Sequence, residues 1–326
     1  MEQMMTAAVL YEPGSADNFK LEERPIPVPL AGQVLIKVRA FGLNRSELMT
    51  RKGLSPDVTF PRILGIECVG EIEEDPNGEW QNGQQVAAFM GNMGRHFDGS
   101  YSQFVVLPRA IISPFQSHLS WEMLGALPEM FQTTYGSLHI ALKIQKGETL
   151  LIRGGTSSIG LLAAQLAKLA GLQVISTTRD ETKIGLLLSN GADQVLIDNG
   201  NLAEKVNHDL SISIDKVLEL VGTNTLKDSL HCVAQGGMVC MTGMLAEQWS
   251  VSSFDPMGFI PAAVGLTVYD SGQIRIPTDL FQHFINSMEQ KEINPPIKKT
   301  FALSDIVAAH VFMESNVGGG KIVVLP

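Results

Sequence analysis

The spacing of apolar residues changes along this chain. In about the first hundred residues, short Val- and Ile-containing runs such as "TAAVLY", "QVLIKVRAFGL" and "SQFVVLP" are separated by Gly, Pro and Asn. This spacing predicts a small β-barrel or sandwich. From about Gly147, apolar strands such as "ETLLIRG" and "LQVISTTR" alternate with longer helical stretches. That alternation predicts βαβ units, and hence a doubly wound parallel sheet in an α/β protein.

The last part of the chain returns to a different pattern. The segment "TDLFQHFINSMEQ" predicts an amphipathic helix, and the tail "FALSDIVAAHVFMESNVGGGKIVVLP" predicts a helix followed by a final strand. No segment repeats at a fixed period. The 326 residues exceed what one hydrophobic core usually serves, so we expect two domains.

The octapeptide "RGGTSSIG" stands between the predicted strand "TLLI" and the predicted helix "LLAAQLAKLAG". Gly155 and Gly160 occupy the first and last positions of a GxGxxG pattern, and Ser157 occupies the middle one. A phosphate binds well at a helix N-terminus, and the Ser157 hydroxyl could add a hydrogen bond to it. The alternative is a purely structural turn. The candidate cofactor residues in this loop are Gly155, Thr156, Ser157, Ser158, Ile159 and Gly160.

The end of the next predicted strand bears on which dinucleotide binds. NAD sites usually carry an acidic residue here, whereas the extra phosphate of NADP needs positive charge. This strand ends at Thr178 and is followed by Arg179, with Lys183 four residues later. We expect Asp180 to cap the following helix. The pattern therefore favours NADPH, and the alternative is that Arg179 and Lys183 are only solvated side chains.

Composition excludes several classes of function. The net charge of −10 and the lack of a Lys/Arg cluster argue against nucleic-acid binding. The three cysteines lie far apart without a CxxC spacing, so we expect neither a disulfide framework nor a cysteine-rich zinc site. Neither a targeting segment nor a membrane-length apolar run is visible. We therefore expect a cytoplasmic, soluble protein with no membrane partner.

A set of motifs resembles the medium-chain dehydrogenase/reductase superfamily and, within it, the zinc-independent, zeta-crystallin-like quinone oxidoreductases. They include "AFGLNRSEL", "FPRILGIECVGEIEE", "DGSYSQFVVLP", the loop segment above, "GGMVCMTG" and the closing "GGGKIVV". The resemblance covers nearly the whole chain. It implies a GroES-like, β-rich substrate domain at 1–125 and 292–326, a Rossmann domain at 126–291, an NAD(P)H cleft between them, and a homodimer.

The same resemblance implies that zinc is absent. Zinc-dependent members carry a Cys at the position of Asn44, a His at Ile66 and another Cys near Glu129 and Met130. Here the Gly-His-Glu triplet of those members reads Gly-Ile-Glu, which lacks the nitrogen and sulfur ligands that catalytic zinc prefers. The four-cysteine lobe of those members is missing too. Hydride transfer must then rely on positioning and on hydrogen-bond donors.

The resemblance also implies roles for residues outside the loop. Asn44 is the leading substrate-side candidate for catalysis, although it could equally cap a helix. Thr133 matches a region that touches the nicotinamide, and Lys321 lies in a segment that reaches the cleft. Tyr269 is a candidate proton donor, with packing at a dimer edge as the alternative. Four further residues are implied at strand ends facing the cofactor: Gly222, Thr242, Gly243 and Met244.

Two positions depart from the family pattern. Met49 replaces a tyrosine common in the quinone reductases, which leaves the substrate open, and Asp198 replaces a tyrosine near the adenosine end, which weakens the case for NADPH. The leading hypothesis is an NADPH-dependent, zinc-independent reductase of quinones or of activated alkenes and carbonyls, acting on a small molecule. The alternatives are an enoyl-thioester reductase and a non-catalytic NADPH-binding or sensor protein.

Overall fold

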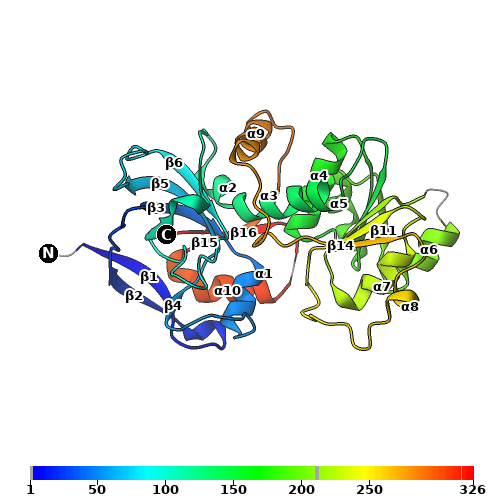
Figure 1. Ribbon diagram of the computed structural model, residues 1–326, viewed down its shortest axis with the longest axis horizontal. Coiled ribbons are helices and arrows are strands. Elements are labelled where there is room, and N and C mark those ends of the chain that lie inside the picture. Colours follow the sequence, from blue (N-terminus) through cyan, green and yellow to red (C-terminus); the bar gives the residue numbers. More distant parts are fainter. Residues whose placement is uncertain (1–2, 210–212, 317) are drawn as a thin grey trace.

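The computed structural model describes residues 3–209, 213–316 and 318–326. They form two lobes that lie side by side along the long axis of the molecule (Figure 1). The first lobe contains the N-terminal strands together with the C-terminal helix and strands, and the second lobe contains the middle of the chain. The predicted pair of architectures, one β-rich and one doubly wound, is therefore present.

The first lobe is built from antiparallel strands, with one parallel pair at its C-terminal edge. Three strands pair in the order β2-β1-β4, and a larger sheet has the order β15-β16-β3-β5-β6-β8, with β7 also paired to β3. The strands are β1 (Met4–Leu10), β2 (Phe19–Pro25), β3 (Gln33–Gly42), β4 (Arg62–Ile63), β5 (Glu67–Glu74), β6 (Gln85–Phe89), β7 (Phe104–Pro108), β8 (Ile112–Pro114), β15 (Ile297–Ala302) and β16 (Lys321–Leu325).

The chain's C-terminal end completes this lobe. In β16, Val323 and Val324 pair with Gly42 and Phe41 of β3, because all four are buried in the lobe's interior. The helical segments here are η1 (Ala16–Asn18), α1 (Arg45–Arg51), η2 (Arg109–Ile111), α2 (Trp121–Gly125), η5 (Leu303–Asp305) and α10 (Ile306–Glu314). This pairing brings Lys321, the first residue of β16, next to the start of α1.

The second lobe contains a six-stranded parallel sheet with helices on both faces. Its strand order is β11-β10-β9-β12-β13-β14. The strands are β9 (Thr149–Arg153), β10 (Gln173–Thr178), β11 (Gln194–Ile197), β12 (Lys216–Glu219), β13 (Met238–Met241) and β14 (Gly265–Val268). The helical segments are α4 (Ser158–Leu169), η4 (Glu181–Lys183), α5 (Ile184–Ser189), α6 (Leu202–Asp209), α7 (Thr223–His231) and α8 (Pro256–Phe259).

The chain reverses its direction of progress across this sheet between β9 and β12, which are neighbours in the sheet. In open parallel sheets, ligands bind outside the carboxyl ends of the strands at such a switch point. The loop after β9 and the start of α4 together read "GGTSSIG", and the loop after β12 contains Gly222. The topology therefore places the candidate cofactor loop where a ligand crevice is expected.

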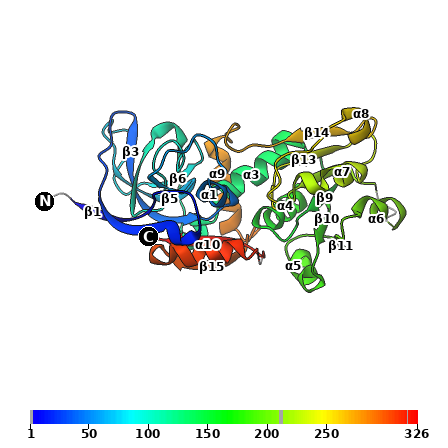
Figure 2. The ribbon, with the colours of Figure 1, turned by 90° about the horizontal axis from the view of Figure 1, so that it is seen from below.

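Two helices lie between the lobes: α3 (Pro128–Tyr135), continued by η3 (Gly136–Ala141), and α9 (Thr278–Glu289) (Figures 1 and 2). Phe131 of α3 stacks on Phe284 of α9, with ring centroids 4.4 Å apart. The same buried cluster extends to Ala87 in the first lobe and to Leu162 of α4 in the second. Because a close-packed interior resists displacement, the packing around α3 fixes its position relative to both lobes.

Candidate functional site

The cofactor loop is a tight turn between β9 and α4. Ser157 is the N-cap of α4: its hydroxyl accepts from the amide of Gly160 at 3.1 Å and donates to the carbonyl of Gly154 at 2.9 Å. The expectation that this hydroxyl hydrogen serves a phosphate is corrected, because the hydrogen is already used within the loop. What the loop offers an anion is the backbone amides of Ser158 and Ile159, which lie in the first helical turn and have no intrahelical acceptor.

The outer glycines of the loop are required by close packing. A Cβ at Gly155 would lie 2.0 Å from the hydroxyl oxygen of Ser176, and a Cβ at Gly160 would lie 2.7 Å from the carbonyl oxygen of Gly155. Ser157 has a φ of −71°, an ordinary extended value. The middle position of the pattern therefore needs no glycine, and the serine there does not distort the turn.

The C-terminal glycine segment packs against this loop. The amide of Gly319 donates to the carbonyl of Thr156 at 2.8 Å. Gly318, Gly319 and Gly320 have φ values of 63°, 92° and 140°, which side chains disfavour. The sequence "GGG" thus lets the chain leave α10, touch the cofactor loop and enter β16.

The end of β10 presents positive charge beside the loop. Arg179 is exposed, and Lys183 is partly buried in η4. Asp180 caps η4, since its carboxylate accepts from the Thr182 amide at 2.9 Å and from the Thr182 hydroxyl at 2.6 Å. The predicted cap is confirmed. The hydroxyl of Thr178 accepts from the Asp180 amide at 3.1 Å and so shapes the turn.

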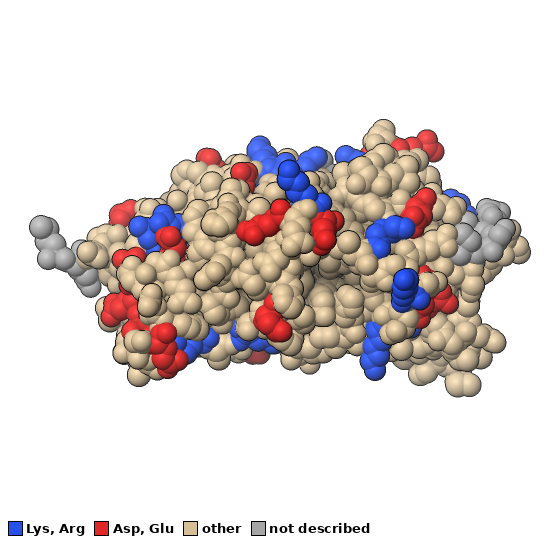
Figure 3. All heavy atoms as spheres, turned by 90° about the horizontal axis from the view of Figure 1, so that it is seen from above, with Lys and Arg blue, Asp and Glu red and all other residues tan. Residues whose placement is uncertain are grey.

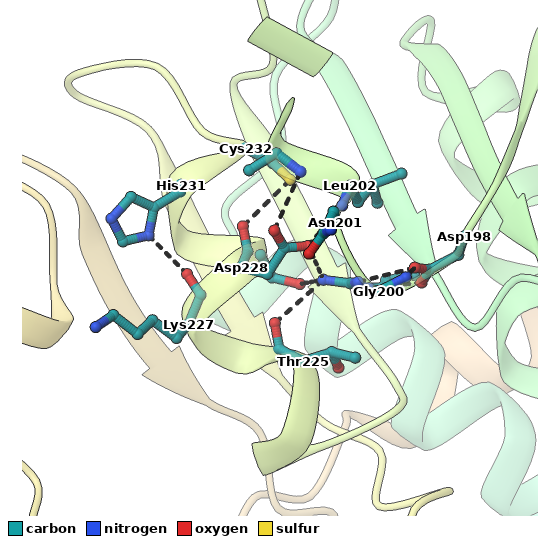
Figure 4. A network of polar contacts seen from close by, with 12 residues as sticks. Asp198, Gly200, Asn201, Leu202, Thr225, Lys227, Asp228, His231 and Cys232 are labelled. Carbon is teal, nitrogen blue, oxygen red and sulfur yellow. Dashed lines mark hydrogen bonds and ion pairs between the residues drawn. The ribbon is translucent and has the colours of Figure 1, made fainter. Parts of the chain in front are cut away.

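A buried arginine lies directly beneath the loop, and sequence reasoning gave it no role. Arg153 is 0% exposed and makes a two-pronged ion pair with Asp198, at 2.7 and 2.9 Å. It also donates to Asp228 at 2.7 Å and to the carbonyl of Thr225 at 3.1 Å; Figure 4 labels its partners Asp198, Thr225 and Asp228. The sequence signal that could have pointed to Arg153 was a charged residue at the end of an otherwise apolar buried strand.

This network neutralises the carboxylate that departs from the family pattern. Burial alone would raise the pKa of Asp198, but the hydrogen bonds and the charge of Arg153 outweigh it and lower that pKa below its ordinary value. Asp198 is therefore an ionised partner of Arg153, and its charge is compensated. The charge of Asp198 therefore does not act against a ribose phosphate, whereas the missing family tyrosine still stands against the NADPH prediction.

Residues from the ends of β12 and β13 gather at the same edge of the sheet. The amide of Gly222 donates to the carboxylate of Glu219 at 3.1 Å, and Gly222 lies beside Met244 with a φ of 120°, which side chains disfavour. A Cβ at Gly243 would lie 2.2 Å from the carbonyl oxygen of Leu220. The Thr242 hydroxyl lies 2.8 Å from that of Ser137 in η3. The expected convergence of Gly222, Thr242, Gly243 and Met244 is thus present, and Thr242 also fastens the sheet to η3.

A compact polar cluster lies between α1 and β16 in the first lobe. The Lys321 ammonium contacts the amide oxygen of Asn44 at 2.5 Å and the Glu67 carboxylate at 2.7 Å. The side-chain amide of Asn44 donates to Glu67 at 2.8 Å and to Glu47 at 3.3 Å. Asn44 also precedes α1 as its N-cap residue, but its side chain makes no capping bond. The alternative that the Asn44 side chain caps a helix is therefore wrong. The Lys321 side chain points at Glu67 rather than at the cofactor loop.

A second carboxyl continues this cluster into α3. The amide of Glu129 donates to Glu67 at 2.8 Å, and the Glu129 carboxyl accepts from the hydroxyls of Thr133 and Ser271, each at 2.6 Å. Its other oxygen has no hydrogen-bond partner among the described residues. Burial raises the pKa of Glu129 to about 7, against the lowering effect of the Ser271 and Thr133 hydroxyls. Burial and the charge of Glu67 raise the pKa of Glu47 to about 8.

Tyr269 is held in a packed position. Its hydroxyl donates to the carbonyl of Ile274 at 3.1 Å, and its ring fills the space beside Gly136, where a Cβ would lie 1.9 Å from the ring. Burial raises the pKa of this phenol above its ordinary value. This arrangement gives the proton-donor role no geometric support and gives Tyr269 a packing role within its own subunit.

Sequence reasoning did not assign roles to Glu47, Glu129 or Ser271. The first two were visible as acidic residues inside apolar segments, "SELM" and "ALPEMF". Ser271 carried no such signal, because it follows β14 in an ordinary turn and meets Glu129 only through the fold. The site therefore combines a predictable sheet edge with a buried acid cluster that the topology assembles.

In this chain, the residues at the positions of the zinc ligands of related enzymes do not form a zinc site. Asn44 and Glu67 already hold the Lys321 ammonium, and Ile66 has no ligand atom. Zinc sites use Cys, His and carboxylate ligands in a set of at least three. In the described part of the chain, no group of three His, Cys, Asp or Glu side chains is placed to hold a metal ion. We derive no chemical step through zinc.

Comparison with known proteins identifies the family to which this chain belongs. The family described as alcohol dehydrogenase GroES-like domain matches residues 30–117, and the family described as zinc-binding dehydrogenase matches residues 158–286. The chain therefore belongs to the medium-chain dehydrogenase/reductase superfamily of oxidoreductases. Within that superfamily it falls in the zeta-crystallin-like group of quinone oxidoreductases. The fold and family that we predicted from the sequence are confirmed.

Individual relatives are distant but nearly as long as this chain. The quinone oxidoreductase of Mus musculus is 26% identical and covers 99% of this chain and 98% of its own length. The acryloyl-coenzyme A reductase of Metallosphaera sedula is 26% identical over 71% of this chain and 74% of its own. The structure of mycobacterial Rv1454c complexed with NADPH superposes with a TM-score of 0.86, at 24% identity, covering 99% of this chain and 100% of that one.

A helix must be long and apolar to cross a bilayer. Across the residues that the structure describes, no helix combines the length and the apolar character needed to cross a membrane.

Proposed function

We propose that this protein is an NADPH-dependent, zinc-independent reductase that transfers a hydride from nicotinamide C4 to quinones or to activated alkenes and carbonyls. The observation that carries the proposal is the charge at the sheet edge. Arg179 is exposed beside the N-terminus of α4, while the neighbouring carboxylates of Asp180 and Asp198 are occupied by Thr182 and Arg153. A dinucleotide pyrophosphate would bind at the helix N-terminus, and a ribose phosphate would meet Arg179.

Hydride transfer leaves negative charge on the substrate oxygen. When bound, NADPH supplies the hydride; the protein must position the acceptor and compensate that charge. Lys321 is the buried cation of the site, and it is linked to Asn44 at 2.5 Å. We propose that Asn44 orients the substrate oxygen and that Lys321 polarises Asn44.

The test measures NADPH binding and turnover separately. Quenching of the fluorescence of the three tryptophans reports binding, and absorbance at 340 nm reports consumption with a quinone, an enone or an enoyl thioester as acceptor. We expect binding and turnover of a quinone or an enone. Binding without turnover of any acceptor would instead identify a non-catalytic NADPH-binding or sensor protein. Full activity after dialysis against a chelator, with no zinc by elemental analysis, is expected for zinc independence.

An enoyl thioester is the second candidate substrate class. It is favoured by the acryloyl-coenzyme A reductase among the relatives, because reduction of an enoyl thioester also delivers hydride to an electron-poor alkene carbon. Faster turnover of an enoyl thioester than of any quinone would assign the protein to this class.

We also propose a cytoplasmic homodimer that acts on a small molecule and has no nucleic-acid or membrane partner. Charged side chains of both signs are interspersed on the face that Figure 3 shows, which is unlike a nucleic-acid footprint. One of the two edge strands of the parallel sheet, β14, carries Val268 at 64% exposure, and α8 carries Met257 at 92%. Light scattering after size-exclusion chromatography tests for the dimer.

A further inference from the structure

The buried acid cluster contains more carboxyls than cations. Glu47, Glu67 and Glu129 are 1%, 0% and 7% exposed, and Lys321 is 2% exposed. Lys321 lies 2.7 Å from Glu67, so this pair is neutral as a unit. A buried carboxylate without a counterion is costly and takes up a proton instead. The other two carboxyls, Glu47 and Glu129, are therefore the proton-holding members of the cluster.

These two acids differ in the groups that link them to the accessible side of the cluster. Glu47 contacts the side chain of Asn44 and, at 3.4 Å, the amide of Ile66. Glu129 instead receives hydrogen bonds from Thr133 and Ser271, both of which are partly exposed. Hydroxyls both donate and accept, so they can pass a proton from a buried acid to the outside. Glu129 thus has two hydroxyl links to the accessible side, whereas within the described residues Glu47 is hydrogen-bonded to an amide side chain and a backbone amide.

The two hydroxyls lie at the edge of the sheet where the cofactor is proposed to bind. Ser137 is one helical turn beyond Thr133: its hydroxyl donates to the carbonyl of Thr133 at 2.7 Å and lies 2.8 Å from Thr242, which follows β13. Ser271 follows β14, the neighbour of β13, and its carbonyl accepts from Gln132 at 2.8 Å. Thr133 and Ser271 are therefore anchored to the carboxyl edge of the parallel sheet.

The charged and titratable groups that face Glu129 come from four elements. Glu67 of β5 raises its pKa and Lys321 of β16 lowers it, while the Thr133 hydroxyl of α3 and the Ser271 hydroxyl after β14 favour the ionised form. Tyr269 is also near, but its hydroxyl is tied to Ile274. Burial dominates these influences, and the resulting pKa of about 7 suits an acid that must release and regain a proton near neutral pH.

We propose that Glu129 supplies the proton that accompanies hydride transfer, passing it through the Thr133 hydroxyl to the reduced substrate and recovering it from solvent through Ser271. This inference rests on the proposed reductase function. When bound, NADPH would supply the hydride, which is one proton and two electrons, and would leave as NADP⁺. The Thr133 hydroxyl proton moves to the substrate anion while Glu129 returns a proton to Thr133. Glu129 is left as a carboxylate and takes one proton from water.

The test compares Glu129→Gln with the wild-type protein over a range of pH. With the quinone or enone that wild type reduces, kcat of wild type should fall as pH rises above about 7, because the acid loses its proton. Glu129→Gln should lower kcat by about 100-fold and remove this pH dependence, while the Kd for NADPH stays unchanged. An unchanged kcat and pH profile in Glu129→Gln would overturn the proposal.

Matched variants on the same helix distinguish the loss of a proton relay from a change in packing. Thr133→Ser keeps the hydroxyl and should retain the pH profile, whereas the isosteric Thr133→Val should lower kcat as Glu129→Gln does. Thr134→Val is the control, because the Thr134 hydroxyl is buried and has no hydrogen-bond partner among the described residues. Equal losses in Thr133→Ser and Thr133→Val would contradict a proton relay.

A measurement without turnover distinguishes this inference from the proposed function. Infrared difference spectra of wild type between pH 6 and pH 8 should contain a carboxylic acid band that Glu129→Gln lacks. If that band is found but no acceptor is reduced, the reductase proposal fails while the protonation of Glu129 stands. If an acceptor is reduced but the band is missing, the reductase proposal stands and Glu129 is not the proton source.

Discussion

Arg179 is exposed at the end of β10. Its planar guanidinium can bind a phosphate through two hydrogen bonds, which the hydroxyls of an unphosphorylated ribose do not match. The nearest acidic residue in sequence, Asp180, is committed to Thr182. We therefore propose that coenzyme preference depends on this single side chain rather than on the loop.

Arg179→Ala should weaken NADPH binding by roughly tenfold to a hundredfold, because a hydrogen bond to a charged group contributes about 1.5–3 kcal/mol. NADH binding should change little. Fluorescence titration with both coenzymes measures the ratio. Lys146→Ala, before the amino end of β9, is the control for a lost surface charge. Equal losses of affinity for NADPH and NADH would show that Arg179 does not recognise the ribose phosphate.

At the scale of elements, β9 is tied to β11 and α7 by one buried side chain. Arg153 ends β9, Asp198 follows β11, and Asp228 lies in α7. Asp228 also accepts from the amide of Leu202, at the start of α6 (Figure 4). The network thus joins the carboxyl end of β9 to neighbouring elements, next to the candidate cofactor loop.

Arg153→Met should lower the free energy of unfolding by about 3–5 kcal/mol, because it leaves Asp198 and Asp228 without their buried partner. Urea denaturation at neutral pH measures this loss. The surface pair of Arg39 and Glu71 provides the control, since Arg39→Met should cost less than about 1 kcal/mol. Similar losses in the two variants would contradict a special role for Arg153.

The same network predicts how stability depends on pH. The folded-state pKa of Asp198 is lowered from its ordinary 3.8, so its contribution is present above that value and is lost as pH falls through the folded pKa. Wild type should therefore lose more stability than Arg153→Met as the pH is lowered below about 4. Denaturation curves at a series of pH values provide the measurement.

At the scale of the whole molecule, ion pairs cross between the two lobes. Glu247, in the loop after β13, contacts Arg45 and Lys52 of the first lobe, each at 3.1 Å. Arg45 also donates to Asn316 at 2.8 Å, near the C-terminal glycine segment. These contacts hold the loop after β13 against the region of α1.

Glu247→Gln should speed NADPH release by no more than about fivefold, since each partly exposed ion pair contributes about 0–1 kcal/mol. Release from wild type should accelerate as salt is added, because salt screens these pairs, and release from Glu247→Gln should respond less. Stopped-flow fluorescence measures both rates. Glu292→Gln, an exposed residue outside these ion pairs, is the control. An identical salt response in Glu247→Gln and wild type would show that these ion pairs do not control NADPH release.

The sequence by itself determined the two architectures, the cofactor loop and the residues at the strand ends. These follow from local patterns, because the period of apolar residues reports strand or helix, and parallel strands bring their carboxyl ends to one edge. The loop glycines and Arg179 could therefore be placed without coordinates. Even within the loop, however, the direction of the Ser157 hydroxyl depended on the carbonyl of Gly154 and was not predictable.

Only the tertiary structure decided how the buried charges are shared. Lys321 and Asn44 are 277 positions apart, and Ser271 and Glu129 are 142 apart, so no local pattern relates them. Whether a carboxyl keeps its proton depends on burial and on the charges around it, which exist only once the two ends of the chain meet in one lobe. The proton-holding acid of this protein is for that reason a property of its fold.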